Sequence, residues 1–131
     1  MTDQEKGGAG AAASFPLRGE ARSSSCGSRL ELGMGTGVDD RVERLGLRVQ
    51  ACAIGQASAA VFAEAARGRT LEEICLAAQE MQAWVTGGGP HPDWPGLDLI
   101  AAAREYPARH GAMLLAWKAA EHAMAEHGRR C

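Results

Sequence analysis

The order of apolar and polar residues predicts a β-hairpin followed by helices. From residue 29 the side chains alternate between apolar and polar or glycine, which is the period of a strand with one buried face. The apolar positions of this first run are Leu30, Leu32 and Met34. A Gly/Asp-rich turn, GTGVDD at 35–40, leads to a second alternating run with apolar positions Leu45, Leu47, Val49 and Ala51. The two runs together predict an antiparallel hairpin.

Every segment after residue 52 has a helical pattern. The Ala-rich stretch AIGQASAAVFAEAARG ends at Gly68, a residue type that commonly ends a helix. T-L-E-E at 70–73 is a capping box that starts a second helix. Its apolar stripe, with residues spaced three and four apart, is Leu71, Ile74, Cys75, Ala78, Met81 and Val85. The breaker-rich loop 87–96 precedes a short helix at about 97–104 and a final one at about 109–127.

These elements predict one α+β domain, a small antiparallel sheet packed against several helices, over residues 25–131. Residues 1–24 predict a weakly ordered leader, because GGAGAAAS is of low complexity and the serine-rich stretch before Cys26 has little to bury. Phe15, Leu17 and Arg18 are compatible with a short edge strand, whereas Pro16 argues against a central one. We expect the leader to serve mostly as a tether.

Composition narrows the classes of function. The chain has 131 residues, and its 14 Lys and Arg nearly balance its 16 Asp and Glu, giving a net charge of −2. This balance argues against nucleic-acid binding through a broad basic surface. No run approaches the roughly 18 consecutive apolar residues of a membrane span, and the start MTDQEKGG lacks the apolar segment of a secretory signal. We therefore expect a cytoplasmic protein without a membrane or nucleic-acid partner.

The four cysteines occupy different kinds of position. Cys26 precedes the first predicted strand and Cys52 follows the second, so we expect these two to lie close together. Cys52 also begins a helix, where free backbone N–H groups and the helix dipole favour a thiolate. Cys75 lies on the apolar stripe and is expected in the core, and Cys131 is expected as a solvated thiol. We expect reduced thiols throughout, because nothing else in the sequence suggests secretion.

Several uses of Cys26 and Cys52 stay open at this stage. The pair is suited to sharing a metal ion or to forming a disulfide. Otherwise Cys52 is a small buried residue that closes the strand and Cys26 is an incidental loop residue. His91 lies beside Asp93 in a loop, where we expect solvated side chains. The sequence has no H-E-x-x-H, C-x-x-C, P-loop or G-x-S-x-G motif, so nothing supports a catalytic triad.

Residues from about 25 to 125 resemble a known family. CGSRLEL, then the hairpin, then ACAIGQASAAVFAEAARGRTLEEI is similar to the iron–sulfur cluster assembly scaffolds of the IscU/SufU type, which are related to the N-terminal domain of NifU. The CAIGQAS segment is the most specific part, and it resembles the SufU-like branch most. RHGAMLLAW in the last helix is similar to the ending of that branch. The resemblance implies an IscU/SufU-like fold.

The resemblance also implies a ligand set. Such scaffolds receive sulfur from a cysteine desulfurase and bind zinc or a nascent [2Fe–2S] cluster through three cysteines and an aspartate, in some members with a histidine. Cys26 and Cys52 match the first two cysteines. Ser28 replaces the aspartate, and Ala112 occupies the position of the third cysteine, which is the expected sulfur acceptor. His110, two residues from that position, is the candidate third ligand.

We therefore expect a non-enzymatic, scaffold-like protein of iron–sulfur cluster assembly that binds iron or a [2Fe–2S] cluster through Cys26 and Cys52. One alternative is a degenerate interaction module that binds or regulates a cysteine desulfurase without carrying a cluster. Another is a zinc-binding sulfur-transfer protein. A third is a redox protein that cycles a Cys26–Cys52 disulfide, which requires Cα atoms within about 7 Å of each other.

Overall fold

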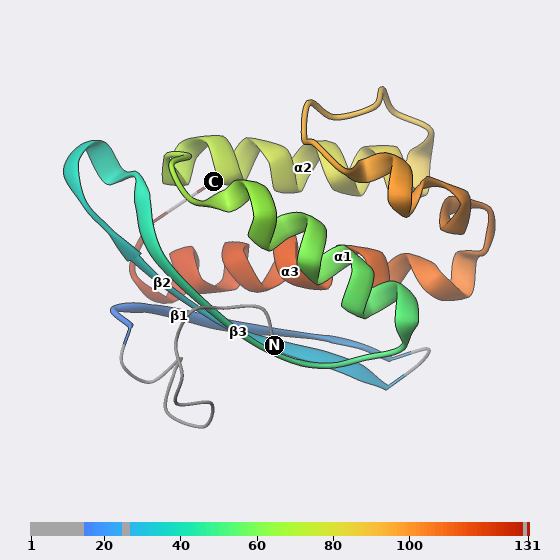
Figure 1. Ribbon diagram of the computed structural model, residues 1–131, viewed down its shortest axis with the longest axis horizontal. Coiled ribbons are helices and arrows are strands. Elements are labelled where there is room, and N and C mark those ends of the chain that lie inside the picture. Colours follow the sequence, from blue (N-terminus) through green and yellow to red (C-terminus); the bar gives the residue numbers. More distant parts are fainter. Residues whose placement is uncertain (1–14, 25–26, 130) are drawn as a thin grey trace.

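A three-stranded antiparallel sheet carries all the helices on one of its faces (Figure 1). The computed structural model describes residues 15–24, 27–129 and 131. The elements are β1 (Leu17–Ser23), β2 (Ser28–Thr36), η3 (Val38–Asp40), β3 (Val42–Gln50), α1 (Ala53–Ala66), α2 (Leu71–Gly87), η4 (Leu97–Leu99), η5 (Ala101–Glu105) and α3 (Pro107–Glu126). The predicted α+β class with a small antiparallel sheet is confirmed.

The predicted hairpin is formed by β2 and β3, and β2 is the central strand of the sheet. The cross-strand pairs on its helix-covered face are Leu30–Val49, Leu32–Leu47 and Met34–Leu45. All of these side chains are buried except Val49, which is half-buried. Burying one such side chain contributes about 1.5–3 kcal/mol, and a slip of one residue would turn the whole set towards solvent. The apolar alternation therefore fixes the register.

Part of the expected leader belongs to the sheet. β1 pairs with β2 along its whole length and occupies one edge, the position that Pro16 permits. Phe15 and Leu17 are buried. The structure thus differs from the predicted boundary at residue 25, because residues 15–24 are part of the domain. Residues 1–14 of the expected leader lie outside the described residues.

α3 lies directly on β1 because Gly19 has no side chain. A Cβ atom at Gly19 would collide with the backbone of Ala119 and Ala123 in α3. Next to this contact, the N–H of Glu20 donates a hydrogen bond to Nδ1 of His122, with a donor–acceptor distance of 3.0 Å. An edge strand exposes unpaired N–H groups, and here α3 both covers the strand and satisfies one of them.

The three long helices follow the sequence prediction, with ends that differ by about two residues. The short helix expected at about 97–104 is instead two 3-10 helices, η4 and η5, separated at Ile100. The capping box at the start of α2 is formed: the Glu73 N–H donates to Thr70 Oγ1 at 3.1 Å, and the Thr70 N–H donates to Glu73 Oε1 at 3.0 Å. Gly88 ends α2 in the left-handed conformation, with φ of 74°. The described residues contain no helix with the length and apolar composition needed to cross a bilayer.

Trp94 anchors the breaker-rich loop between α2 and η4 to the core. Its ring stacks on Phe62, with centroids 5.6 Å apart, and meets Trp117 edge-on at the same distance. Its Nε1–H donates a hydrogen bond to the carbonyl of Val61 at 2.9 Å, and the guanidinium of Arg69 lies 4.1 Å from its ring centroid. The loop is therefore held against α1 even though its backbone is irregular.

Cys75 and Cys131 form a disulfide, with Cα atoms 5.4 Å apart. The expectation of two reduced thiols, one in the core and one solvated, is wrong for this pair, although Cys75 is buried as its stripe predicts. The reason is the course of the chain after α3. Gly128, with φ of 79°, turns the backbone so that the Arg129 N–H donates to the Met124 carbonyl at 2.7 Å. The 56-residue separation of the cysteines gives no sequence signal for this contact.

Replacing Cys131 by Ser tests this disulfide. The chain-entropy model predicts that losing a cross-link over 56 residues lowers the free energy of unfolding by roughly 4 kcal/mol. Urea unfolding without reductant should show this loss, and with dithiothreitol the two proteins should unfold alike. Equal stability without reductant would contradict the disulfide.

Candidate functional site

Cys52 lies at the junction between β3 and α1, as the N-cap residue of the helix. Its side chain is exposed, and it is the one free cysteine among the described residues. The thiol makes no capping hydrogen bond, and the first turn of α1 contains no acidic residue. The Cys52 sulfur is therefore accessible, at a helix N-terminus, to a metal ion or to a partner protein.

Ser28 connects the start of β2 to Cys52. Its hydroxyl oxygen accepts a hydrogen bond from the Cys52 N–H at 3.3 Å, and Ser28 is only 3% exposed. Ser28 also pairs with Ser23 at the end of β1, so the ends of all three strands meet here. The start of β2 and the end of β3, which the predicted hairpin brings together, therefore lie side by side. Cys26 itself lies outside the described residues.

Ser28 thus has a structural role that the sequence alone did not indicate. In sequence it marks a lost ligand, whereas in the structure its buried hydroxyl satisfies the backbone N–H of the helix N-cap. The signal is its position opposite Ser23 in the β1–β2 ladder, which becomes visible only once β1 is known to be a strand.

The first part of α3 packs against the same end of the sheet. A Cβ atom at Gly111 would lie 2.6 Å from Ser23 Oγ, so glycine permits the close approach of the helix. The neighbouring Ala112 is fully buried, and its Cβ lies 3.7 Å from where a Cβ of Gly55 would be, in the first turn of α1. The position that carries a cysteine in the resembled family is therefore close to the Cys52 helix, but a methyl group fills it.

His110 is half-buried near the start of α3, and its Nε2 lies 2.7 Å from the carbonyl oxygen of Arg104. A carbonyl only accepts hydrogen bonds, so Nε2 carries the proton and Nδ1 keeps its lone pair. Metal-binding histidines commonly have this arrangement. Within residues 15–24, 27–129 and 131, however, no three His, Cys, Asp or Glu side chains gather closely enough to hold a metal.

His91 is exposed in its loop, as the sequence predicts, and its ion-pair partner is Asp98. Its Nε2 lies 3.5 Å from Asp98 Oδ1, and its ring centroid is 5.1 Å from that of Trp84. The His91 side chain is about half exposed. His91 therefore packs on the Trp84 ring and pairs with Asp98 instead of the adjacent Asp93.

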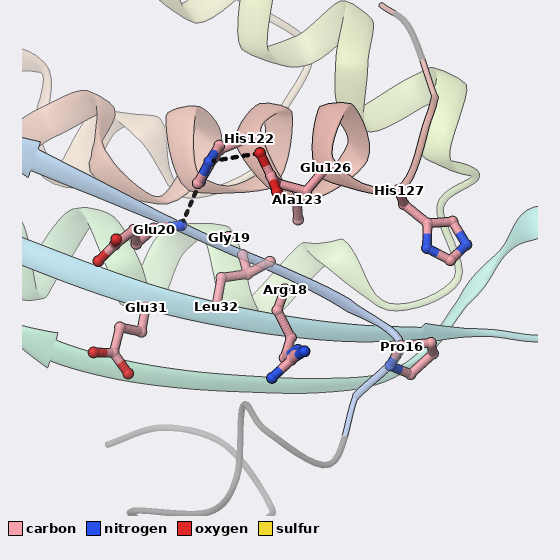
Figure 2. Close-up of a pocket in the computed structure, with 10 residues that line it drawn as sticks. All are labelled: Pro16, Arg18, Gly19, Glu20, Glu31, Leu32, His122, Ala123, Glu126 and His127. Carbon is pink, nitrogen blue, oxygen red and sulfur yellow. Dashed lines mark hydrogen bonds and ion pairs between the residues drawn. The ribbon is translucent and has the colours of Figure 1, made fainter.

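A surface pocket of about 520 Å³ lies along the outer edge where β1 meets the second half of α3 (Figure 2). Glu20 and Glu31 line it on the sheet side, and His122 and Glu126 on the helix side (Figure 2). Both ring nitrogens of His122 have partners, because Nδ1 accepts from the Glu20 N–H and Nε2 lies 3.5 Å from Glu126 Oε2. The pocket is far along α3 from Ala112, so it is separate from the Cys52 site.

Comparison with known proteins supplies structural relatives. No protein-family model and no curated protein sequence matches the chain. The N-terminal part of a nitrogen-fixing NifU-like protein from Brucella abortus superimposes with a TM-score of 0.80 at 28% identity, over 87% of this chain and 80% of that one. A protein from Fervidobacterium islandicum, described as an iron–sulfur cluster assembly scaffold for the SUF system, gives 0.69 at 26% identity, over 82% and 79%.

These relatives confirm the expected fold. Both belong to the NifU and SufU group that the CAIGQAS segment and its flanks resemble, so the chain has the IscU/SufU-like fold. A third structure, of a hypothetical protein, is 23% identical with a TM-score of 0.67 and shows the same fold.

Replacing Ser28 by Ala should lower the free energy of unfolding by about 0.5–1.5 kcal/mol, because the partly buried hydrogen bond from the Cys52 N–H is lost. The matched control is Ser24→Ala, since Ser24 is exposed one residue after β1 and should tolerate the change. Urea unfolding of both variants measures the difference. Equal stabilities would mean that the Ser28 hydroxyl does not hold the helix N-cap.

Proposed function

We propose that this protein with the IscU/SufU-like fold is a scaffold-like, non-enzymatic component of iron–sulfur cluster assembly. Its cargo is iron or a [2Fe–2S] cluster, bound by Cys26 and Cys52. The observation that carries the proposal is the exposed Cys52 thiol at the N-terminus of α1. The backbone N–H of Cys52 donates a hydrogen bond to Ser28, which ties this position to the start of β2. Ser28 is two residues from Cys26, so covalent geometry limits their Cα separation to about 7 Å. We propose that the two thiols converge on one iron atom.

The donor chemistry supports this cargo. Thiolates are the usual ligands of iron–sulfur clusters, and Cys52 lies at the N-terminus of α1, where the helix dipole favours negative charge. Two thiolates leave the set incomplete, and we propose His110, whose Nε2 is engaged by the Arg104 carbonyl, as the third ligand through Nδ1. The remaining ligand comes from water, a small thiol or a partner. We expect such a site to hold its cargo less firmly than a complete protein set would.

The structural relatives support the same process. The Fervidobacterium islandicum protein, 26% identical over 82% of this chain, is described as an iron–sulfur assembly scaffold. We propose a cysteine desulfurase as the partner that supplies sulfur, and the cytoplasm as the location. Ala112 stands where the resembled family carries its sulfur-accepting cysteine. Among the described residues, Cys52 is then the free thiol that could accept sulfur from the desulfurase.

A second candidate function is a degenerate interaction module that binds or regulates a cysteine desulfurase without cargo. This function is favoured because Ser28 and Ala112, which replace two ligands of the resembled family, both make structural contacts inside the fold. Ala112 is fully buried, and the Ser28 hydroxyl is engaged by the Cys52 backbone. Zinc is the alternative cargo, because thiolate and imidazole ligands suit it as well.

The Cys52→Ser variant tests the proposed function. Anaerobic incubation of the wild type with iron and sulfide should produce bound iron and the visible absorbance of thiolate-bound clusters. Cys52→Ser and Cys26→Ser should each lose most of both, because one thiolate is too few to retain the cargo. Cys131→Ser is the matched control, since it removes a sulfur from the disulfide and leaves the site intact.

The other outcomes separate the candidate functions. Zinc bound in place of iron, lost with Cys52→Ser, indicates the sulfur-transfer alternative. A wild type that binds neither metal but is retained by an immobilised cysteine desulfurase is an interaction module. Iron binding that survives both cysteine substitutions contradicts the proposed site.

Replacing Ala112 by Cys should increase cluster retention. The new thiol lies beside the first turn of α1, where the resembled family carries its third cysteine. Adding a sulfur to a fully buried position costs about 1–3 kcal/mol of stability. Ala112→Ser is the control of similar size without a thiolate. The lifetime of the reconstituted cluster in the presence of a chelator is the measurement, and an unchanged lifetime would count against a site at this end of α3.

A further inference from the structure

One face of the sheet carries no helix (Figure 1). Charged residues lie on this face in rows across the strands. Residues paired across antiparallel strands share a face, and the buried leucines of β2 point towards the helices, so the residues between them point away. Two neighbouring rows across β1, β2 and β3 are Arg22–Arg29–Gln50 and Glu20–Glu31–Arg48. Every member is exposed or half-buried.

Each row places like charges directly opposite one another. Arg22 is the cross-strand partner of Arg29, and Glu20 is the partner of Glu31. Like charges in this position destabilise a sheet, whereas exchanging one arginine with one glutamate would create favourable pairs. Neither glutamate nor Arg22 forms an ion pair with another described residue, and Arg29 donates to the neutral Gln50 Oε1 at 2.7 Å. Within these two rows Glu31 has an oppositely charged cross-strand partner, Arg48. The like-charged pairs Arg22–Arg29 and Glu20–Glu31 are therefore compensated only in part inside the chain.

We propose that a second copy of this chain docks on this face and forms a two-fold symmetric dimer. A two-fold axis parallel to the rows and midway between them lays the arginine row of each copy over the glutamate row of the other. Glu20 then faces Arg22 of the second copy, and Glu31 faces its Arg29. The half-buried Arg48 faces Gln50 of the second copy, an uncharged acceptor. Symmetry repeats every contact, as in isologous interfaces generally.

The same pattern argues against a nucleic acid as the occupant. A phosphate backbone gains affinity by contacting many cationic side chains in succession. Here Glu20 and Glu31 lie next to the arginine row and would repel phosphates, and the chain as a whole carries a net charge of −2. The rows fit a surface that bears both charges in the opposite order, and this chain has such a surface.

Analytical ultracentrifugation of the full chain tests the dimer. Free thiols are blocked with N-ethylmaleimide so that no interchain disulfide contributes. At low ionic strength the mass should rise with concentration from 13.7 kDa towards twice that value. The mass should return to that of the monomer at high salt, because the Debye screening length shortens from about 30 Å at 0.01 M to about 3 Å at 1 M.

Two charge reversals make the test specific. Arg22→Glu with Arg29→Glu makes both rows acidic, and Glu20→Arg with Glu31→Arg makes both rows basic. Each variant alone should dissociate about 100-fold more readily, because like charges then face each other across the interface. An equimolar mixture of the two should recover the dimer, which also shows that both variants are folded.

The control reverses two glutamates that are exposed on the helices, Glu64→Arg with Glu80→Arg. This variant has the same net charge as the basic-row variant and should dimerise like the wild type. A wild type that stays monomeric at low salt overturns the proposal. So does a dimer that is unaffected by either row reversal, or a mixture of the two that remains monomeric.

Discussion

α3 rests on the edge strand β1 at two places where a glycine removes the side chain that would separate them. Gly19 allows the backbone of Ala123 to touch the strand, and Gly111 allows the start of α3 to reach Ser23. These contacts fix both ends of the helix relative to the sheet. They also carry Ala112 to the first turn of α1, and so determine which side chains surround Cys52. The candidate site is therefore a consequence of how closely one helix approaches one strand.

The sequence predicts the elements whose burial has its own period. Leu30, Leu32 and the stripe of α2 repeat at strand and helix spacing, and both proved buried. β1 lacks that signal, because its inward positions include Gly19 and the half-buried Ala21. Its stability comes from α3, which follows it by almost a hundred residues. The Cys75–Cys131 disulfide escaped prediction for the same reason, since a turn at the end of α3 brings distant residues together.

The positions of the residues in the candidate site were predictable to different degrees. Cys52 could be assigned to a strand–helix junction because the period changes from two to that of a helix at this residue. His110 could be named only by its closeness in sequence to the third-cysteine position, and its bond to Arg104 depends on the 3-10 turn before α3. The role of Ser28 required the register of three strands. A side chain that holds a backbone in place resembles a lost ligand when only the sequence is considered.

The charged rows on the open face and the Cys52 site lie at different positions along the same strands. This offset determines whether the second copy of a dimer can contribute a ligand to the site. Arg29 follows Ser28 directly, and Gln50 is two residues before Cys52, so the charged rows begin beside the site. A two-fold axis between the rows nevertheless sends the Cys52 of the second copy three rows away, about 20 Å along the strands. The second copy then cannot supply the missing ligand through this interface. Under the proposed function, each site would complete its coordination with His110, a small molecule or a different protein, and the dimer would present two independent sites.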